Sequence, residues 1–320
     1  MQIQTLIQDI YTTIQRKDGW FNDELARDFS SNVGARLQDQ LGEKQGPPTL
    51  RLSQMGPRCP KALWHSIHRP ELAEALPPQA EIKYSYGHII EALVIVLAEA
   101  AGHRVEGKQD VITLDGVSGH RDCVIDGCTV DIKSSSSLGM VKFKTGSIAQ
   151  DDPFGYLDQL DGYVVGSYAD PLVLVKDKGY LLAVDKTLGH MVLYEHRIRE
   201  ERIRSRIREH KRIVSLATPP ACTCGTVEHG KSGNIKLDTK ASYSLYKHVC
   251  FPNLRTFLYS DGPVYLTKVE RLPDVPEITR SGIVLQQESS PQFPSSSEQG
   301  SPSYTTTTSR LGANPWNLPA

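Results

Sequence analysis

Two aspartates and one lysine have the residue types and the spacing of a site that binds a metal ion and activates water. Asp131 and Lys133 are two residues apart in Val-Asp-Ile-Lys, so on a β-strand their side chains project to the same side. A neighbouring strand joined by a short turn would bring Asp122 alongside them. Two carboxylates held close repel each other unless a cation lies between them, and such oxygen ligands suit Mg²⁺ or Mn²⁺ rather than zinc. An ordinary exposed ion pair on an edge strand is the alternative interpretation of Asp131 and Lys133.

Three other polar residues stand out in segments predicted to be helical. Glu91 falls within residues 81–101, a helix that is apolar on most sides. A charge there is rarely tolerated without a partner, and a metal is one such partner. A narrow solvated stripe along the helix is the alternative. Gln159 and Tyr163 are four residues apart in a predicted helix around residues 156–169, so an amide and a phenol share one helical face.

These residues belong to four short motifs that follow one another along the chain. The motif pairs are Gly87/Glu91, Gly119/Asp122, Asp131/Lys133 and Gln159/Tyr163. In this order the chain resembles the RecB-type nucleases of the PD-(D/E)XK superfamily, which include phage exonucleases and CRISPR-associated adaptation nucleases. That family shows Gly-X-X-X-Glu or His on a helix, then Gly-His-X-Asp, then Asp/Glu-X-Lys and then Gln-X-X-X-Tyr. The resemblance covers roughly residues 50–200.

The resemblance implies a division of labour among these residues. Lys133 would position the attacking water, and the metal would polarise the scissile phosphate. Gln159 and Tyr163 would steady the site or touch the DNA backbone. The implied metal ligands for Mg²⁺ or Mn²⁺ are Glu91, Asp122, Asp131 and the backbone carbonyl of Ile132.

The function implied by the resemblance is that of a metal-dependent DNA exonuclease, which hydrolyses phosphodiester bonds at DNA ends in phage-type recombination, repair or genome processing. Its expected partners are DNA and a recombination or single-strand-binding protein. A structure-selective or restriction-like endonuclease and a non-catalytic DNA-binding protein of the same fold are the alternatives. The intact set of Asp122, Asp131 and Lys133 favours an enzyme.

The elements that must position these residues alternate between helices and strands, with Asp-Gly turns at 115–116 and 126–127. This order predicts a mixed α/β or α+β sheet with helices on its faces. The resemblance implies a PD-(D/E)XK, restriction-endonuclease-like core with a mixed central sheet. The predicted helices are 81–101 and 156–169, and the predicted strands are 111–114, 117–125, 128–133, 180–184 and 191–194.

The two ends of the chain differ from this middle part. Residues 1–48 are predicted to form a helical extension, in which Leu6, Ile10 and Ile14 recur at a spacing of four. The nuclease domain, with a Cys-containing C-terminal segment, would occupy residues 49–275. Residues 276–320, rich in Ser, Thr and Pro, are predicted to form a disordered tail.

Four of the six cysteines form a second candidate site. The segment beginning Cys59-Pro-Lys-Ala-Leu-Trp resembles the one that supplies the first iron–sulfur ligand in cluster-bearing members of the family. Those members place three more cysteines late in the domain, and here Cys222, Cys224 and Cys250 are available, although their spacing departs from the family pattern. The open interpretations are a 4Fe-4S cluster, a zinc site that could include His229 or His248, and no metal at all.

Two further motifs have competing interpretations. Residues 195–213 contain seven Arg and one Lys against four Glu, so they predict either a helix that contacts DNA phosphates or a solvated face with internal Glu–Arg pairs. Gly225-Thr-Val-Glu-His-Gly-Lys-Ser232 fits the phosphate-loop pattern, but Pro219-Pro precedes it and Gly233-Asn follows it where a strand and a helix should lie. That stretch is predicted to be a polar loop.

Composition sets limits on the function. The chain has 320 residues, 39% of them hydrophobic, and 36 Lys and Arg against 37 Asp and Glu, so DNA contact would need a local basic patch. No apolar stretch is long enough to span a membrane, and the first residues carry no export signal. Six cysteines are too few for a disulfide scaffold. An intracellular, cytoplasmic location is therefore predicted, within the host cell if the origin is a phage.

Overall fold

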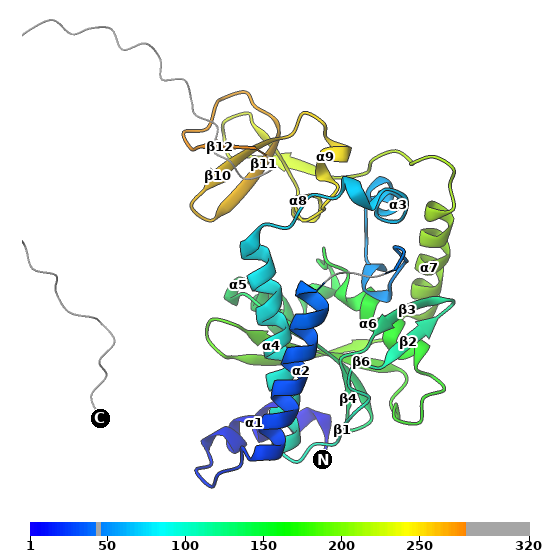
Figure 1. The fold of residues 1–320 in the computed structure, drawn as a ribbon, viewed down its shortest axis with the longest axis vertical. Coiled ribbons are helices and arrows are strands. Elements are labelled where there is room, and N and C mark those ends of the chain that lie inside the picture. Colours follow the sequence, from blue (N-terminus) through cyan, green and yellow to red (C-terminus); the bar gives the residue numbers. More distant parts are fainter. Residues whose placement is uncertain (43–45, 280–320) are drawn as a thin grey trace, which may run out of the picture. The chain divides into compact units, whose positions relative to one another are not determined.

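A mixed five-stranded sheet organises the first part of the fold in the computed structural model, which describes residues 1–42 and 46–279 (Figure 1). Strands β5 and β6 run parallel, and the other neighbouring strands are antiparallel. In spatial order the strands are β1 (Val105–Glu106), β4 (Cys123–Ile125), β5 (Cys128–Ser135), β6 (Lys178–Asp185) and β7 (Met191–Arg197). The predicted mixed sheet with flanking helices is confirmed.

Helices cover both faces of this sheet, so most residues of its parallel strands β5 and β6 are buried on both sides. Leu182 of β6 packs in a cluster with residues of α1 (Leu6–Gln15) and α4 (Pro78–Ala100). The neighbouring Leu181 packs in a second cluster with residues of α5 (Ser137–Thr145) and α6 (Tyr156–Gly166). The short 3₁₀ turns η1 (Ile3–Thr5) and η4 (Ser147–Ala149) belong to the same two layers.

The N-terminal helices pack into this core. Leu6 and Ile10 are fully buried in the same cluster as α4, as their spacing predicted, whereas Ile14 is exposed. Helix α2 (Asp23–Leu41) begins after Asn22, whose side chain accepts hydrogen bonds from the first turn, and it packs beside α4. The described residues belong to one compact unit of the chain.

The predicted strand 117–125 is interrupted, so the expected three-strand meander is divided between two sheets. Strand β3 (Val117–His120) pairs only with β2 (Val111–Leu114) among the described strands, in a separate hairpin. The chain leaves the ladder at residues 121–122 and enters the central sheet at β4. The hairpin packs on α6 and on η2 (Leu52–Gln54) through a cluster that includes Ile112 and Leu52.

The basic helix begins later than predicted. Residues 195–197 belong to β7, because they continue its pairing with β6, and α7 runs from Glu200 to Val214. The apolar stripe of α7 is buried through Ile203 and Ile207, as expected. Helix α3 (Pro60–His68), followed by η3 (Pro70–Leu72), packs against the end of α7, where Trp64 Nε1 donates to the carbonyl of Leu216 at 2.8 Å.

A second sheet is formed by the last described part of the chain. Its spatial order is β12 (Glu277–Ile278), β10 (Arg255–Tyr259), β11 (Gly262–Lys268), β9 (Ile235–Leu237) and β8 (Thr226–Glu228). The short helices α8 (Thr239–Ser242) and α9 (Lys247–Cys250) lie between β9 and β10 along the chain.

Two predictions about this region need correction. The stretch 225–232, predicted to be a polar loop, contains strand β8, which pairs with the antiparallel strand β9. Because β9 and not a helix follows it, the phosphate-loop interpretation stays rejected. The predicted tail 276–320 starts too early, because Glu277 pairs in the ladder with Phe257 and its carboxylate accepts two hydrogen bonds from Arg255. The rest of that predicted tail, residues 280–320, lies outside the described residues. In residues 1–42 and 46–279, no helix is both long enough and apolar enough to cross a membrane.

Candidate functional site

Asp122 and Asp131 lie opposite each other on neighbouring segments of the central sheet. Cys123 pairs with Val130, so Asp122, just before β4, continues the register toward Asp131 on β5. Asp122 Oδ2 accepts a hydrogen bond from the backbone N–H of Ile132 at 2.7 Å. The short turn therefore brings the two aspartates together as the sequence suggested. Ile132, whose carbonyl was the predicted ligand, contacts Asp122 through its N–H.

Glu91 of α4 points toward the same group, and its side chain is 14% exposed. Arg36 of α2 lies 3.7 Å from Glu91 Oε1. The side-chain amide of Gln109 donates to Glu91 Oε1 and, at 3.5 Å, to Asp122 Oδ1. Glu91 is thus partnered by a cation and an amide rather than lying on a solvated stripe. Helix α4 itself is less buried than predicted, because Ile82 and Tyr84 in its first half are exposed.

Lys133 connects β5 to α6. Its Nζ lies 2.7 Å from Asp131 Oδ2 and donates to Gln159 Oε1 at 3.3 Å. Gln159 Nε2 in turn donates to the hydroxyl of Tyr163 at 2.9 Å, as expected for residues four apart on one helix. The ring of Tyr156 lies 4.9 Å from the same ammonium. All six side chains predicted from the sequence therefore meet in one place.

Burial and mutual repulsion make this acidic group costly to ionise. Burial raises the pKa of Asp122 well above its usual range, and the charges of Glu91 and Asp131 add to that shift. Burial also raises the pKa of Glu91 and of Asp131, although Arg36 and Lys133 respectively oppose it. Burial disfavours the charged form of Lys133 too, but Asp131 and Asp122 outweigh it and raise the pKa of Lys133. The lysine is therefore an ammonium near neutral pH and not a base.

The donor set fits a hard divalent cation in chemistry, since it offers carboxylate oxygens in a buried place with excess negative charge. Asp131 is fully buried, and its Oδ1 has no hydrogen-bond partner among the described residues. A bound cation would reduce the repulsion among the carboxylates and would give Asp131 Oδ1 a partner. The carboxylates do not converge as tightly as the four cysteines, which form the one close group in residues 1–42 and 46–279 that could hold a metal ion.

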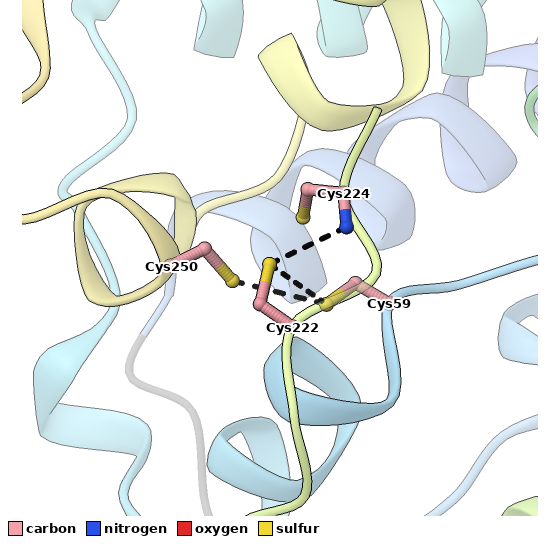
Figure 2. Close-up of side chains that lie close together, drawn as sticks. All are labelled: Cys59, Cys222, Cys224 and Cys250. Carbon is pink, nitrogen blue, oxygen red and sulfur yellow. Dashed lines mark hydrogen bonds between the residues drawn. The ribbon is translucent and has the colours of Figure 1, made fainter. Parts of the chain in front are cut away.

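The four cysteines predicted as a second site come together from three distant segments (Figure 2). Cys59 precedes α3, Cys222 and Cys224 precede β8, and Cys250 ends α9. Their sulfurs all lie within 4.8 Å of one another, with Cys59 Sγ 3.7 Å from Cys222 Sγ and 3.8 Å from Cys250 Sγ. The predicted proximity is confirmed, and the group is able to hold a metal ion.

The thiols of this group share hydrogen bonds in a way that favours one thiolate. Contacts with Cys224 and Cys250 lower the pKa of Cys59, whereas contacts with Cys250 and Cys59 raise the pKa of Cys224. The histidines considered as alternative ligands have other partners: His229 Nε2 lies 3.1 Å from the hydroxyl of Tyr259, and His248 Nε2 lies 3.1 Å from Glu74 Oε1. Among the described residues, the group that could hold a metal ion consists of the four cysteines. The remaining two cysteines are buried core residues, Cys123 and Cys128.

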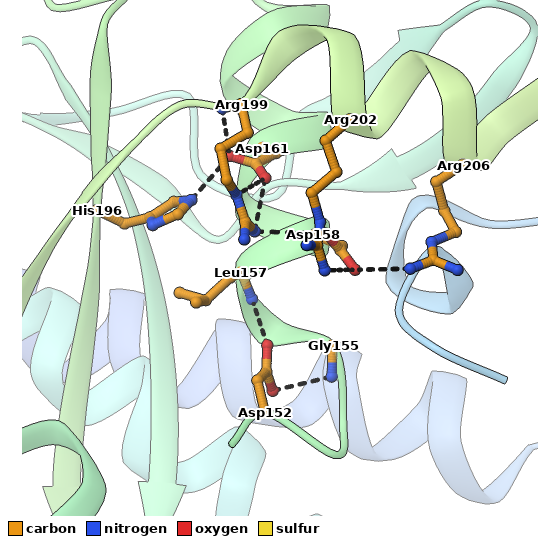
Figure 3. A network of polar contacts seen from close by, with 9 residues as sticks. All are labelled: Asp152, Gly155, Leu157, Asp158, Asp161, His196, Arg199, Arg202 and Arg206. Atoms are coloured by element: carbon orange, nitrogen blue, oxygen red, sulfur yellow. Dashed lines mark hydrogen bonds and ion pairs between the residues drawn. The ribbon is translucent and has the colours of Figure 1, made fainter. Parts of the chain in front are cut away.

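Two buried aspartates of α6 hold the basic helix in place (Figure 3). Asp161 accepts hydrogen bonds from Arg199 Nε at 3.0 Å and from His196 Nε2 at 2.8 Å. Asp158 accepts from Arg202 Nε at 2.8 Å, and Arg206 lies 3.9 Å away. Most arginines of residues 195–213 therefore have acidic partners within the chain. This favours a helix whose arginines form internal ion pairs over one whose arginines are free to contact DNA phosphates. The paired arginines are Arg199, Arg202, Arg204, Arg206 and Arg212.

Sequence reasoning missed the residues that hold the site together. Asp158 and Asp161 flank Gln159 on an apolar helix, and the signal that singled out Glu91, a charge in an apolar setting, applies to them as well. Gln109 gives no such signal, because it lies in the polar turn Gly-Lys-Gln-Asp, where a surface residue is the ordinary expectation.

No family model and no curated protein matches this chain. Among solved structures, the crystal structure of SSO0001 is 15% identical, and the match covers 69% of this chain and 95% of that chain with a TM-score of 0.40. A similarity of this size carries no argument about fold family or activity, so the function must be argued from the site itself.

Proposed function

We propose that the chain is a metal-dependent nuclease that hydrolyses phosphodiester bonds in DNA. The observation that carries the proposal is the convergence of the buried Asp131, the partly buried Asp122 and a charged lysine, in which Lys133 Nζ lies 2.7 Å from Asp131 and Asp122 lies opposite across the register. Like charges held close together destabilise the fold. A site that binds a cation and an anionic substrate would explain why these carboxylates are present. A structural ion pair would not need Asp122 as a third member.

Each side chain has a role in this proposal that follows from its position. Asp122, Asp131 and Glu91 would hold Mg²⁺ or Mn²⁺, which when bound would polarise the scissile phosphate and lower the pKa of a water. Lys133 remains an ammonium, so it would hold the attacking water or a phosphate oxygen by hydrogen bonding. Gln159 accepts from Lys133 and would fix the direction in which that ammonium points.

The resemblance of the four motifs to RecB-type nucleases extends the proposal to a PD-(D/E)XK core and to cleavage at DNA ends. Purified chain should therefore degrade linear duplex DNA with Mg²⁺ or Mn²⁺ and leave covalently closed circles intact, and EDTA should stop the reaction. Cutting of both substrates would support the endonuclease alternative. DNA binding without hydrolysis by the metal-loaded chain would support the non-catalytic alternative.

For the cysteine group we propose a single tetrahedral zinc ion. Zinc–sulfur bonds of about 2.3 Å place the sulfurs of a tetrahedral site about 3.8 Å apart. The sulfur distances of 3.7 and 3.8 Å from Cys59 match that value. A 4Fe-4S cluster interposes iron and sulfide between the cysteines and would hold their sulfurs further apart. The ion would tie α3 to the segments before β8 and at the end of α9, which supports a structural role.

Elemental analysis of the purified chain tests the zinc proposal. We expect about one zinc per chain, a colourless protein, and loss of zinc in Cys222→Ser. Cys128→Ala is the matched control, because Cys128 is buried in the central core away from the group, and it should keep its zinc. Iron, sulfide and a brown protein after anaerobic purification would contradict zinc.

A further inference from the structure

Gln109 connects two of the candidate metal ligands through one side chain. It lies in the turn between β1 and β2, and its amide donates to Glu91 Oε1 and to Asp122 Oδ1. Glu91 comes from α4 and Asp122 from the edge of the central sheet, so the amide links carboxylates of two different elements. Each carboxylate uses one oxygen in this contact, which leaves the second oxygen of Glu91 for another partner.

The backbone of this turn is held in an uncommon conformation. Gln109 has a φ of 60°, in the left-handed region that non-glycine residues seldom adopt. Asp115 and Asp126 share this feature, but each precedes a glycine in a two-residue hairpin turn, where such a φ is expected. Gln109 is followed by Asp110, so its conformation has no such explanation. Strained residues of this kind gather at functional sites.

A buried arginine fixes the same turn. The N–H of Gln109 donates to the carbonyl of Asp122 at 3.0 Å, and the N–H of Arg121 donates to the carbonyl of Asp110 at 3.0 Å. The guanidinium of Arg121 is fully buried and binds the Asp110 carboxylate. A Cβ at Gly107 would lie 2.3 Å from that guanidinium, so the turn requires glycine there. The turn between β1 and β2 is thus fixed by these contacts, and it holds the Gln109 amide against the carboxylates of Glu91 and Asp122.

We propose that Gln109 is a positioning residue for the divalent cation held by Glu91 and Asp122, a role that rests on the proposed function. Without the amide, the partly buried carboxylates of Glu91 and Asp122, which repel each other, would turn apart. With the amide, the carboxylates of Glu91 and Asp122 face the same space. The fold then holds them close before the cation binds, so binding does not have to supply the free energy of bringing them together. Hydrogen-bond partners of metal ligands contribute about 10- to 100-fold to metal affinity.

Titration of the full chain with Mn²⁺, followed by the electron paramagnetic resonance signal of the free ion, measures this role without DNA. We expect Gln109→Met, which keeps the size but lacks the amide, to weaken Mn²⁺ binding about tenfold or more. Gln150→Met is the matched control, because Gln150 is an exposed glutamine of another turn, and its affinity should equal that of the wild type. Thermal melts show which variants are folded. If Gln109→Met is unfolded, Gln109→Asn is used in its place. The shorter Asn side chain should not reach both carboxylates, so this variant should also bind Mn²⁺ more weakly than the wild type.

The outcomes separate this inference from the proposed function. Wild-type affinity, or tighter binding, in folded Gln109→Met would overturn the role of Gln109 and leave the nuclease proposal standing. Absence of Mn²⁺ binding by the wild-type chain at the acidic group, judged against Asp131→Asn, would overturn both. Weakened binding in the Gln109 variant with an unchanged Gln150 control is the result that the geometry predicts.

Discussion

Replacing Asp122 by Asn should stabilise the metal-free chain while it destroys the proposed metal site. Burial and the charges of Glu91 and Asp131 raise the pKa of Asp122, so the folded state opposes its ionisation. Asn has the same shape, and its Oδ1 can still accept the Ile132 N–H that Asp122 binds at 2.7 Å. The substitution therefore removes a repelled buried charge at the loss of little packing.

The size of the effect should depend on pH. A carboxyl whose pKa is raised by folding stabilises the fold while it is protonated, and that stability is lost as the pH rises through the folded-state pKa. At pH 8 in EDTA we expect Asp122→Asn to raise the free energy of unfolding by about 1–3 kcal/mol, because the repulsion from Glu91 and Asp131 is removed, an effect within the usual range for one substitution. The gain should fall toward zero near pH 4, about where the unfolded aspartate itself becomes protonated.

Urea denaturation of both proteins in EDTA, at pH 8 and near pH 4, measures these differences. Asp161→Asn is the control, because Asp161 is a fully buried aspartate bound by Arg199 and His196, whereas the partly buried Asp122 lies among other carboxylates. Breaking that buried network should lower the free energy of unfolding by about 3–5 kcal/mol. If Asp122→Asn were destabilised at pH 8 as strongly as Asp161→Asn, the reasoning about a repelled acidic group would be refuted.

Three other expectations follow from the structure. Lys133→Met should lower the rate of DNA hydrolysis about 100-fold or more with little change in the Kd for DNA, and an unchanged rate would exclude a role in the reaction. Truncation after Leu285 should leave the melting temperature unchanged. Truncation after Val275 removes β12 and the Arg255–Glu277 pair, so it should lower the melting temperature. Equal melting temperatures of the two truncated chains would show that β12 does not contribute to stability. Chelation of the cysteine-bound metal should increase proteolysis between β8 and β10, with Cys222→Ser already in that state, and resistance of both would argue against a structural ion.

Local sequence pattern predicted the parts of the site that depend on local geometry. Asp131 and Lys133 share a side because strand residues alternate, and Gln159 and Tyr163 meet because helix residues four apart are neighbours. The Asp126-Gly turn was enough to bring Asp122 beside β5. These relations span few residues, so spacing alone determines them.

Longer-range relations could not be predicted in this way. The interruption at Arg121 and Asp122 follows from the burial of the Arg121 side chain against Asp110 and Asp170, which no periodicity reveals. Gln109 reaches Glu91 only because Arg121 and Asp122, which lie between β3 and β4, hold the turn that carries it. Cysteine count suggested a shared site, but the close approach of the four sulfurs, on which the zinc proposal rests, needed the fold.

The most direct test of the central claim is the rate of linear DNA hydrolysis at increasing Mn²⁺ concentration, measured for the wild-type chain and for Asp131→Asn. The account predicts a saturable, EDTA-sensitive rate for the wild type and a rate lower by orders of magnitude for a folded Asp131→Asn that still binds DNA. Hydrolysis by Asp131→Asn at the wild-type rate, or hydrolysis by the wild type that persists in EDTA, would contradict a metal-dependent site at Asp122, Asp131 and Lys133.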